Sequence, residues 1–472
     1  MDSLPIIIFW IAAVLCVIRG PVAIIYLLFL SMPFGAFAVV PPAISAGMTF
    51  TPAPMAGLLL IARVFLSLKG LDYLVSLVVR PQRLTLLLAF WLVALFTTVF
   101  MPRLLARKVE VIPLKLDLVT AVVYLEPTSQ NISQLCYMTI SVLTVCAFAY
   151  VLRSPAARAH TLRALYIGAT VLVVTGGLDF ANQYVPLGAF LEPFRTATYS
   201  LLTDAEILGA KRIVGLMPEA SAFGSVTVGF LSAIYFFRSA SADVGISATR
   251  FKVLIVFLLV FVWLSTSSAA YVGLFVFFAA AGLEWLWRGA AIARGSSLRR
   301  GMIGELLVLT TLVVVVCLVT VIDASIWTPL LTMLDETILQ KNTTSSFEER
   351  GTWTSVSWQA FLDSNGLGVG LGGTRASNSV VSLLSNVGLL GGLLYYGFLA
   401  VTLLRPLPRG DANSAAYLHG ARWSFVAPFA TSVLAATTPD FGTFNAFLFA
   451  MALSSTVNDR HREMAKGSLV NG

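Results

Sequence analysis

Four basic residues lie in long polar segments of an otherwise apolar chain, at positions where they could hold an anion. Lys211 and Arg212 precede one apolar run, and Arg350 and Arg375 lie in the longest polar segment, residues 341–378. An arginine guanidinium presents a planar fork that matches two phosphate oxygens, and it stays charged in a partly dry site. The residue types therefore favour phosphate or pyrophosphate binding. The alternative is ordinary ion pairing with acids of the same segment, namely Glu348, Glu349 and Asp363.

An acid follows the first pair of basic residues. Glu219 lies seven residues after Arg212, in RIVGLMPEASAFG, where an apolar run begins. A carboxylate at that boundary could act as a general base. In the alternative interpretation, Pro218 takes the first helical position and the acid only complements the helix dipole.

Aromatic residues and glycines follow Arg350. The segment ERGTWTSVSWQAF has helical potential, and Trp353, three residues after Arg350, would share its helical face and could stack on a sugar ring. Location at the membrane interface is the alternative for Trp353 and Trp358. The following NGLGVGLGGTRASN permits tight turns that expose backbone N–H groups to an anion. Its spacing matches neither a P-loop nor a dinucleotide fingerprint.

The rest of the chain is composed to position such segments at a membrane. Of 472 residues, 58% are hydrophobic and 11% charged, which predicts an all-α polytopic transmembrane bundle of about 12–14 spans with large outer loops, in a single integral membrane domain, residues 1–472. Thirteen apolar runs are expected to be spans, several of them short enough to be tilted or broken: Leu4–Ile18, Val22–Val40, Pro52–Leu68, Leu84–Met101, Ile132–Leu152, Ala164–Leu178, Glu219–Phe237, Val253–Leu264, Ala269–Leu283, Leu306–Ile322, Ser379–Leu404, Trp423–Thr437 and Thr443–Val457.

Charge asymmetry predicts the orientation of this bundle. Most of the 31 Lys and Arg residues fall in one alternating set of connections, which we expect on the cytoplasmic side together with the C-terminus. The opposite set includes three long loops, residues 102–131, 179–218 and 324–378, the last being the large periplasmic loop. Arg63 lies within an apolar run, close enough to its end for its side chain to snorkel to the surface. The net charge of +8 is thus a topology signal that requires no nucleic-acid partner.

The sequence patterns of several kinds of functional site are absent from the chain. The four cysteines form neither a disulfide framework nor a zinc spacing, and the three histidines are scattered. No Asp-x-Asp pair and no Walker sequence is present. We therefore expect no metal and no cofactor, and a reaction that starts from an already activated donor.

The order of these features resembles the bacterial O-antigen ligase and polymerase superfamily, which includes the Wzy-type polysaccharide polymerases. The resemblance spans most of the chain and rests on LEPTSQNISQLCY, RIVGLMPEASAFG, LSTSSAAYVG, ERGTWTSVSWQAFLDSNGLGVGLGG and NSVVSLLSNVGLLGGLLYY. It implies a GT-C-like membrane fold in the bacterial inner membrane. It also implies metal-independent, inverting transfer of a glycan from undecaprenyl pyrophosphate, with a chain-length regulator and a flippase as further partners.

Carried onto this sequence, the resemblance makes Arg212 and Arg350 ligands of the pyrophosphate. Lys211, Trp353, Arg375 and Asn378 complete the expected substrate-binding residues. Ligase members typically carry a histidine and an asparagine after the glycine turn, where this chain has Ser377 and Asn378, so a polymerase is favoured over a ligase. The arginine that follows the serine-rich break in ligase-like members is replaced by Ala269 and Ala270. A transporter of lipid-linked oligosaccharide is the alternative from another class, although the spans carry almost no interior charge.

Overall fold

The structure is a computed structural model of the chain. It describes residues 4–41, 44–45, 48–79, 84–114, 122–207, 210–240, 244–289, 301–322, 345–408 and 412–454. Part of the expected periplasmic loop, residues 324–344, lies outside these ranges. The described chain is mostly helical, with two short antiparallel hairpins.

The elements follow one another along the chain as α1 (Leu4–Arg19), α2 (Pro21–Ser31), α3 (Pro52–Phe65), α4 (Leu68–Val79), α5 (Thr85–Leu104), β1 (Glu110–Val111), β2 (Val123–Tyr124), α6 (Ser129–Val151), α7 (Pro155–Ala181), α8 (Gly188–Leu191), the short 3-10 helix η1 (Glu192–Phe194), β3 (Glu206–Ile207), β4 (Ala210–Lys211), α9 (Ala220–Phe236), α10 (Ala248–Leu264), α11 (Ser268–Gly289), α12 (Met302–Ile322), α14 (Ser345–Asp363), α15 (Ser379–Leu403), α16 (Ala412–Ala435) and α17 (Gly442–Ser454).

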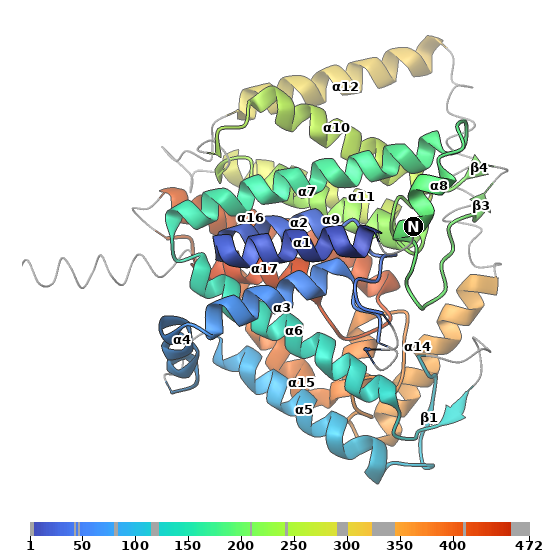
Figure 1. Cartoon of the computed structure of the whole chain (residues 1–472). Coiled ribbons are helices and arrows are strands. Elements are labelled where there is room, and N and C mark those ends of the chain that lie inside the picture. The colour runs from blue at the N-terminus through green and yellow to red at the C-terminus, as the bar shows by residue number, and fades with distance from the viewer. Residues whose placement is uncertain are drawn as a thin grey trace, which may run out of the picture.

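The long helices lie side by side in one bundle with two distinct ends (Figure 1). One end holds α8, α14 and the short strands, and we call it the loop end. The other end holds α4, and we call it the α4 end. Each of the thirteen apolar runs coincides with or overlaps a helix. Within the described residues, five of these helices (α5, α6, α7, α11 and α15) are long and apolar enough to cross a membrane, which fits a multi-pass membrane protein.

Several helix boundaries differ from the sequence prediction, and one helix was not expected. Helix α2 ends at Ser31, whereas the apolar run was expected to continue as a span to Val40. Pro33 explains the early end, since proline has no N–H with which to continue the helical hydrogen bonds. The connection expected between Lys69 and Arg83 instead contains helix α4.

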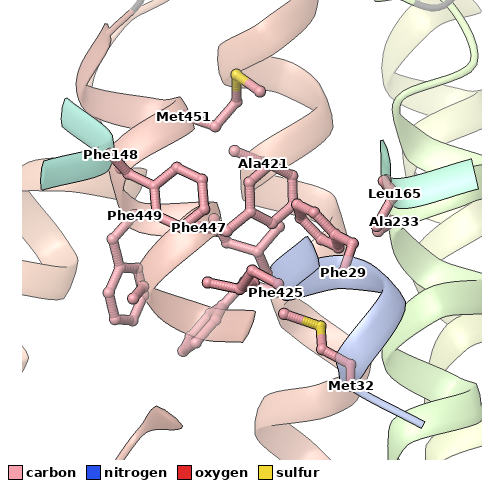
Figure 2. Packing of buried hydrophobic residues seen from close by; sticks show 14 of the residues in the cluster. Phe29, Met32, Phe148, Leu165, Ala233, Ala421, Phe425, Phe447, Phe449 and Met451 are labelled. Atoms are coloured by element: carbon pink, nitrogen blue, oxygen red, sulfur yellow. The ribbon is translucent and has the colours of Figure 1, made fainter. Parts of the chain in front are cut away.

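The centre of the bundle is filled by aromatic side chains around the short helix α17, which is buried from Ala446 to Ser454. Phe447 contacts Phe29 of α2 edge-to-face, with ring centroids 5.0 Å apart, and lies 6.2 Å from Phe148 of α6 (Figure 2). Helices within a bilayer associate through such close packing and not through exclusion of water. Helix α17 therefore serves as the packing centre for elements from both halves of the chain.

A cluster of buried charges joins four elements towards the α4 end of the bundle. Glu284 of α11 pairs with Arg288 at 2.9 Å, with Arg238 at 2.8 Å and with the ring of His419 of α16 at 2.7 Å. Glu305 of α12 pairs with Arg238 at 2.9 Å and also contacts Arg288. No described side chain of α12 is fully buried. The contacts of Glu305 are therefore a principal attachment of α12 to the bundle.

Candidate functional site

Arg212 follows the hairpin of β3 and β4 and is half-buried at the loop end. Its Nε donates to the Thr266 hydroxyl at 3.0 Å, and its Nη2 donates to the Thr266 carbonyl oxygen at 3.0 Å. Thr266 lies in the break between α10 and α11 with φ of 46°, a left-handed conformation that is uncommon for a residue other than glycine. The serine-rich break thus fixes one edge of the guanidinium. Nη1 makes no hydrogen bond to a described residue.

Two other charged groups act on Arg212, and one of them, Arg350, is distant in sequence. Burial lowers the pKa of Arg212, the Glu219 carboxylate acts to raise that pKa, and the Arg350 guanidinium acts to lower it further. Both charges therefore lie within electrostatic reach of Arg212. The carboxylate offsets only part of the positive charge of the two guanidinium groups, so the place favours an anion.

Arg350 lies on α14, which is docked beside the chain that leads into α15. The Thr354 hydroxyl accepts from the backbone N–H of Ser377 at 3.2 Å, and Ser357 donates to the carbonyl of Arg375 at 2.8 Å. Arg350 itself is half-buried, and its guanidinium forms no ion pair or hydrogen bond within the described ranges. The expected alternative, pairing with Glu348, Glu349 or Asp363, is not seen for this residue.

Glu219 directly precedes the first residue of α9. The helix therefore begins two residues later than the start expected at Pro218. Its side chain does not cap the helix. One carboxylate oxygen instead accepts a hydrogen bond from the Ser221 hydroxyl. The group is half-buried and lies within electrostatic reach of Arg212.

Lys211 pairs with a buried acid, Asp179, that the sequence prediction did not select. Its Nζ lies 3.6 Å from Asp179 and 3.3 Å from Asp204. Asp179 is fully buried at the end of α7, where it also pairs with Arg195 at 3.1 Å and accepts from the backbone N–H groups of Val214 and Gly215 at 2.8 and 3.0 Å. Asp179 therefore anchors the segment that carries Arg212, and Lys211 contributes to that anchor.

Asp179→Asn is expected to lower the free energy of unfolding by about 1–3 kcal/mol, because two cations and two backbone donors lose a charged acceptor. Thermal unfolding in detergent measures this loss. Asp204→Asn is the matched control, because Asp204 pairs with the same lysine but is 84% exposed and should contribute less than about 1 kcal/mol. Equal losses in the two variants would contradict the anchoring role.

Trp353, Arg375 and Asn378 form a group beside Arg350. The Arg375 guanidinium lies over the Trp353 ring, 3.9 Å from its centroid, and burial lowers the pKa of Arg375 while Glu349 acts against that effect. Trp353 is almost wholly buried. Arg375 covers its ring at the place where a sugar was expected to stack. The Asn378 side chain accepts from the backbone N–H groups of Val380 and Val381 and caps helix α15. These contacts position the chain around Arg350.

Several N–H groups of the glycine turn are satisfied within the protein. The N–H of Val369 donates to Ser385 O at 2.8 Å, that of Gly370 to Asn386 O at 2.9 Å, and that of Leu371 to the Thr98 hydroxyl at 3.0 Å. The turn is buried against α5, α6 and the kink that Gly388 makes in α15. Its glycines allow close backbone contact with these three helices.

Gly368→Ala should therefore be more damaging than Gly366→Ala. Both residues have a positive φ, 82° and 75°, so the conformational cost of about 1–2 kcal/mol is shared. A Cβ at Gly368 would lie 2.6 Å from the backbone nitrogen of Gly388, whereas a Cβ at Gly366 meets only the Phe361 ring at 3.6 Å. We expect a further loss of about 1–3 kcal/mol for Gly368→Ala, measured by thermal unfolding of both variants. Indistinguishable melting temperatures would show that this backbone contact is unimportant.

The structure thus places Glu219 and Arg350 within electrostatic reach of Arg212 and gives the remaining predicted site residues supporting contacts. Asp179, Arg195 and Thr266 are the positioning residues that the sequence prediction missed. Asp179 had a signal, since it directly follows the predicted span Ala164–Leu178, where an acid that becomes buried is costly unless it is paired. Comparison of the chain with models of protein families, with characterised proteins and with solved structures finds no match.

Proposed function

We propose that the protein is a polymerase of a bacterial surface polysaccharide, transferring a growing glycan from undecaprenyl pyrophosphate to a lipid-linked repeat unit at the periplasmic face. The observation that supports this proposal is that Arg350, far from Arg212 in the sequence, lies within electrostatic reach of it at one end of a bundle of apolar helices. Their excess positive charge is suited to a diphosphate at the membrane boundary, where the headgroup of a lipid-linked donor would lie.

The reaction is a single displacement. The hydroxyl oxygen of the acceptor sugar forms a bond to the anomeric carbon of the donor, and the bond from that carbon to the pyrophosphate oxygen breaks with its electron pair. Attack from the face opposite the leaving group inverts the anomeric centre. Arg212 and Arg350 stabilise the negative charge that develops on the pyrophosphate, a role in which each donor is typically worth about 3–4 kcal/mol. Glu219 takes the proton from the attacking hydroxyl.

Glu219→Gln tests the assignment of the base. The amide keeps the size of the side chain and its hydrogen bond with Ser221 but cannot accept a proton at neutral pH. We expect transfer to slow by about a hundredfold, with the affinity for undecaprenyl pyrophosphate unchanged within about threefold. Single-turnover transfer in vesicles separates these two quantities. Loss of affinity at an unchanged chemical rate would remove Glu219 from the role of base.

The products distinguish the proposal from its two alternatives. Purified protein in vesicles, supplied with the lipid-linked repeat units of its own host, should give a ladder of glycans on undecaprenyl pyrophosphate. A ligase would give one transfer to a second acceptor, lipid A core, and no ladder. A transporter would move the lipid-linked oligosaccharide across the bilayer and form no new glycosidic bond. Either of those outcomes would replace the polymerase proposal.

A further inference from the structure

The helix at the end of the bundle away from the candidate site has a surface pattern that none of the preceding roles explains. Helix α4 lies across the end of α3, in contrast to the long helices of the bundle (Figure 1). It is held there by a tilted ring contact between Tyr73 and Tyr150, with centroids 5.4 Å apart, and by the Arg153 guanidinium 5.5 Å from the Tyr73 ring centroid. A helix set across a bundle of membrane-crossing helices lies along the membrane surface.

The side chains of α4 form three parallel stripes with the same spacing. Gly70, Tyr73 and Leu77 face the bundle, with Leu77 only 1% exposed. The polar residues Lys69, Asp72 and Ser76 form a second stripe. Leu68, Leu71 and Val75 form the third stripe, and they are 87%, 48% and 51% exposed. Residues at i, i+3 and i+7 share one helical face, so the helix has a bundle face, a water face and an apolar face.

The apolar face of α4 continues an exposed apolar surface of α1. Leu66, in the turn before α4, is 87% exposed, and Ile18 at the adjoining end of α1 is 73% exposed. Arg63 of α3 links these two places, because its Nε donates to the carbonyl of Val17 at 3.3 Å. The exposed leucines thus lie near the place where the exposed apolar side of α1 ends.

Positive charge surrounds this face. Four exposed cations, Arg19, Arg63, Lys69 and Arg153, lie at the same end of the bundle, and none of them forms an ion pair with a described carboxylate. Asp72 is the one acid on α4 itself. Cations beside an exposed apolar stripe match the two layers of an anionic membrane surface, the charged headgroups and the acyl boundary below them.

We propose that α4 is an in-plane helix that docks into the headgroup region of an anionic phospholipid leaflet. Leu68, Leu71 and Val75 insert at the acyl boundary, and Arg19, Arg63 and Lys69 bind headgroup phosphates. The helix thereby fixes the depth of the bundle in the membrane at the end opposite the candidate site. This inference depends on the membrane location of the chain and not on the glycan-transfer proposal.

Spin labels at adjacent positions test the docking. Residues 71 and 72 lie on different stripes. Each is replaced by cysteine (Leu71→Cys or Asp72→Cys) and labelled in the full-length protein, from which the native cysteines have been removed: Cys16, Cys136, Cys146 and Cys317. The protein is reconstituted in vesicles of phosphatidylcholine alone or mixed with phosphatidylglycerol. Collision with oxygen reports lipid contact, and collision with a water-soluble nickel chelate reports water contact. We expect oxygen to dominate at position 71 and nickel at position 72.

The dependence of α4 docking on anionic lipid and on Lys69 is measured with the same label. Lys69→Gln should lower the ratio of lipid-inserted to water-exposed label at position 71 by about fivefold in the anionic vesicles and leave it unchanged in pure phosphatidylcholine. Val75→Cys repeats the measurement in case labelling at position 71 disturbs folding. Equal nickel access at positions 71, 72 and 75 would overturn the docking. If oxygen collision dominates but changes neither when phosphatidylglycerol is added nor in Lys69→Gln, the preference for anionic lipid would be overturned.

Discussion

Arg350→Ala is expected to reduce glycan transfer by about a thousandfold and to leave the protein folded. Catalysis should fall because one of the two guanidinium groups that hold the departing pyrophosphate is lost. Stability should persist because the Arg350 guanidinium makes no ion pair or hydrogen bond with a described residue. A half-buried charge without a described partner is a candidate to bind a ligand. Single-turnover transfer and thermal unfolding on the same preparation measure both effects.

Two further variants sharpen this prediction. Arg350→Lys keeps the positive charge and loses the planar fork, so its loss of activity should be smaller than that of Arg350→Ala but clearly measurable. Arg103→Ala removes an exposed arginine from the last turn of α5, also at the loop end, and should transfer glycan at the normal rate. Normal polymer from Arg350→Ala, or an equal loss from Arg103→Ala, would show that general surface charge and not a specific ligand explains the effect.

Glu284→Gln is expected to cost about 3–5 kcal/mol of stability, the largest effect of any single substitution away from the candidate site. Glu284 is 1% exposed and pairs with Arg238, Arg288 and His419. An amide would leave the guanidinium of Arg288, whose side chain is 3% exposed, with less compensation in a place that water does not reach. The expected result is a lower melting temperature in detergent and a looser attachment of α12.

Glu305→Gln is the matched control for Glu284→Gln. Glu305 contacts the same two arginines from α12, but its side chain is 24% exposed. Water can solvate the arginines on that side, so the loss of stability should be clearly smaller. A control variant that is as unstable as Glu284→Gln would indicate that attachment of α12, and not burial of charge, determines the stability of the cluster.

The sequence predicted the helices well because composition determines them. A bilayer requires long apolar helices, and each predicted apolar run coincides with or overlaps one. The errors come from local backbone chemistry and from amphipathic pattern. Pro33 ends α2 early, and α4 was missed because its three stripes have too little total hydrophobicity for a span. The spacing of Leu68, Leu71 and Val75 was nonetheless visible in the sequence.

The candidate site was only partly predictable. Arginines in polar segments could be selected by type, but the placement of Arg350 within reach of Arg212 depends on packing between segments far apart in the chain. The role of Asp179 depends on which backbone N–H groups it faces. The partners of the glycine turn were missed for the same reason, since sequence shows that a backbone is free to bend but not what its donors will meet. The N–H groups of Val369, Gly370 and Leu371 meet α15 and Thr98.

The most direct measurement of the central claim is a double-mutant cycle on the affinity for undecaprenyl pyrophosphate, using Arg212→Gln, Arg350→Gln and the double variant in vesicles, with undecaprenyl phosphate as the comparison lipid. If both guanidinium groups hold one diphosphate, each single change should weaken pyrophosphate binding more than phosphate binding. Their effects should then fall short of additivity by more than about 0.5 kcal/mol. Two strictly additive effects, or equal losses for both lipids, would contradict a shared diphosphate site.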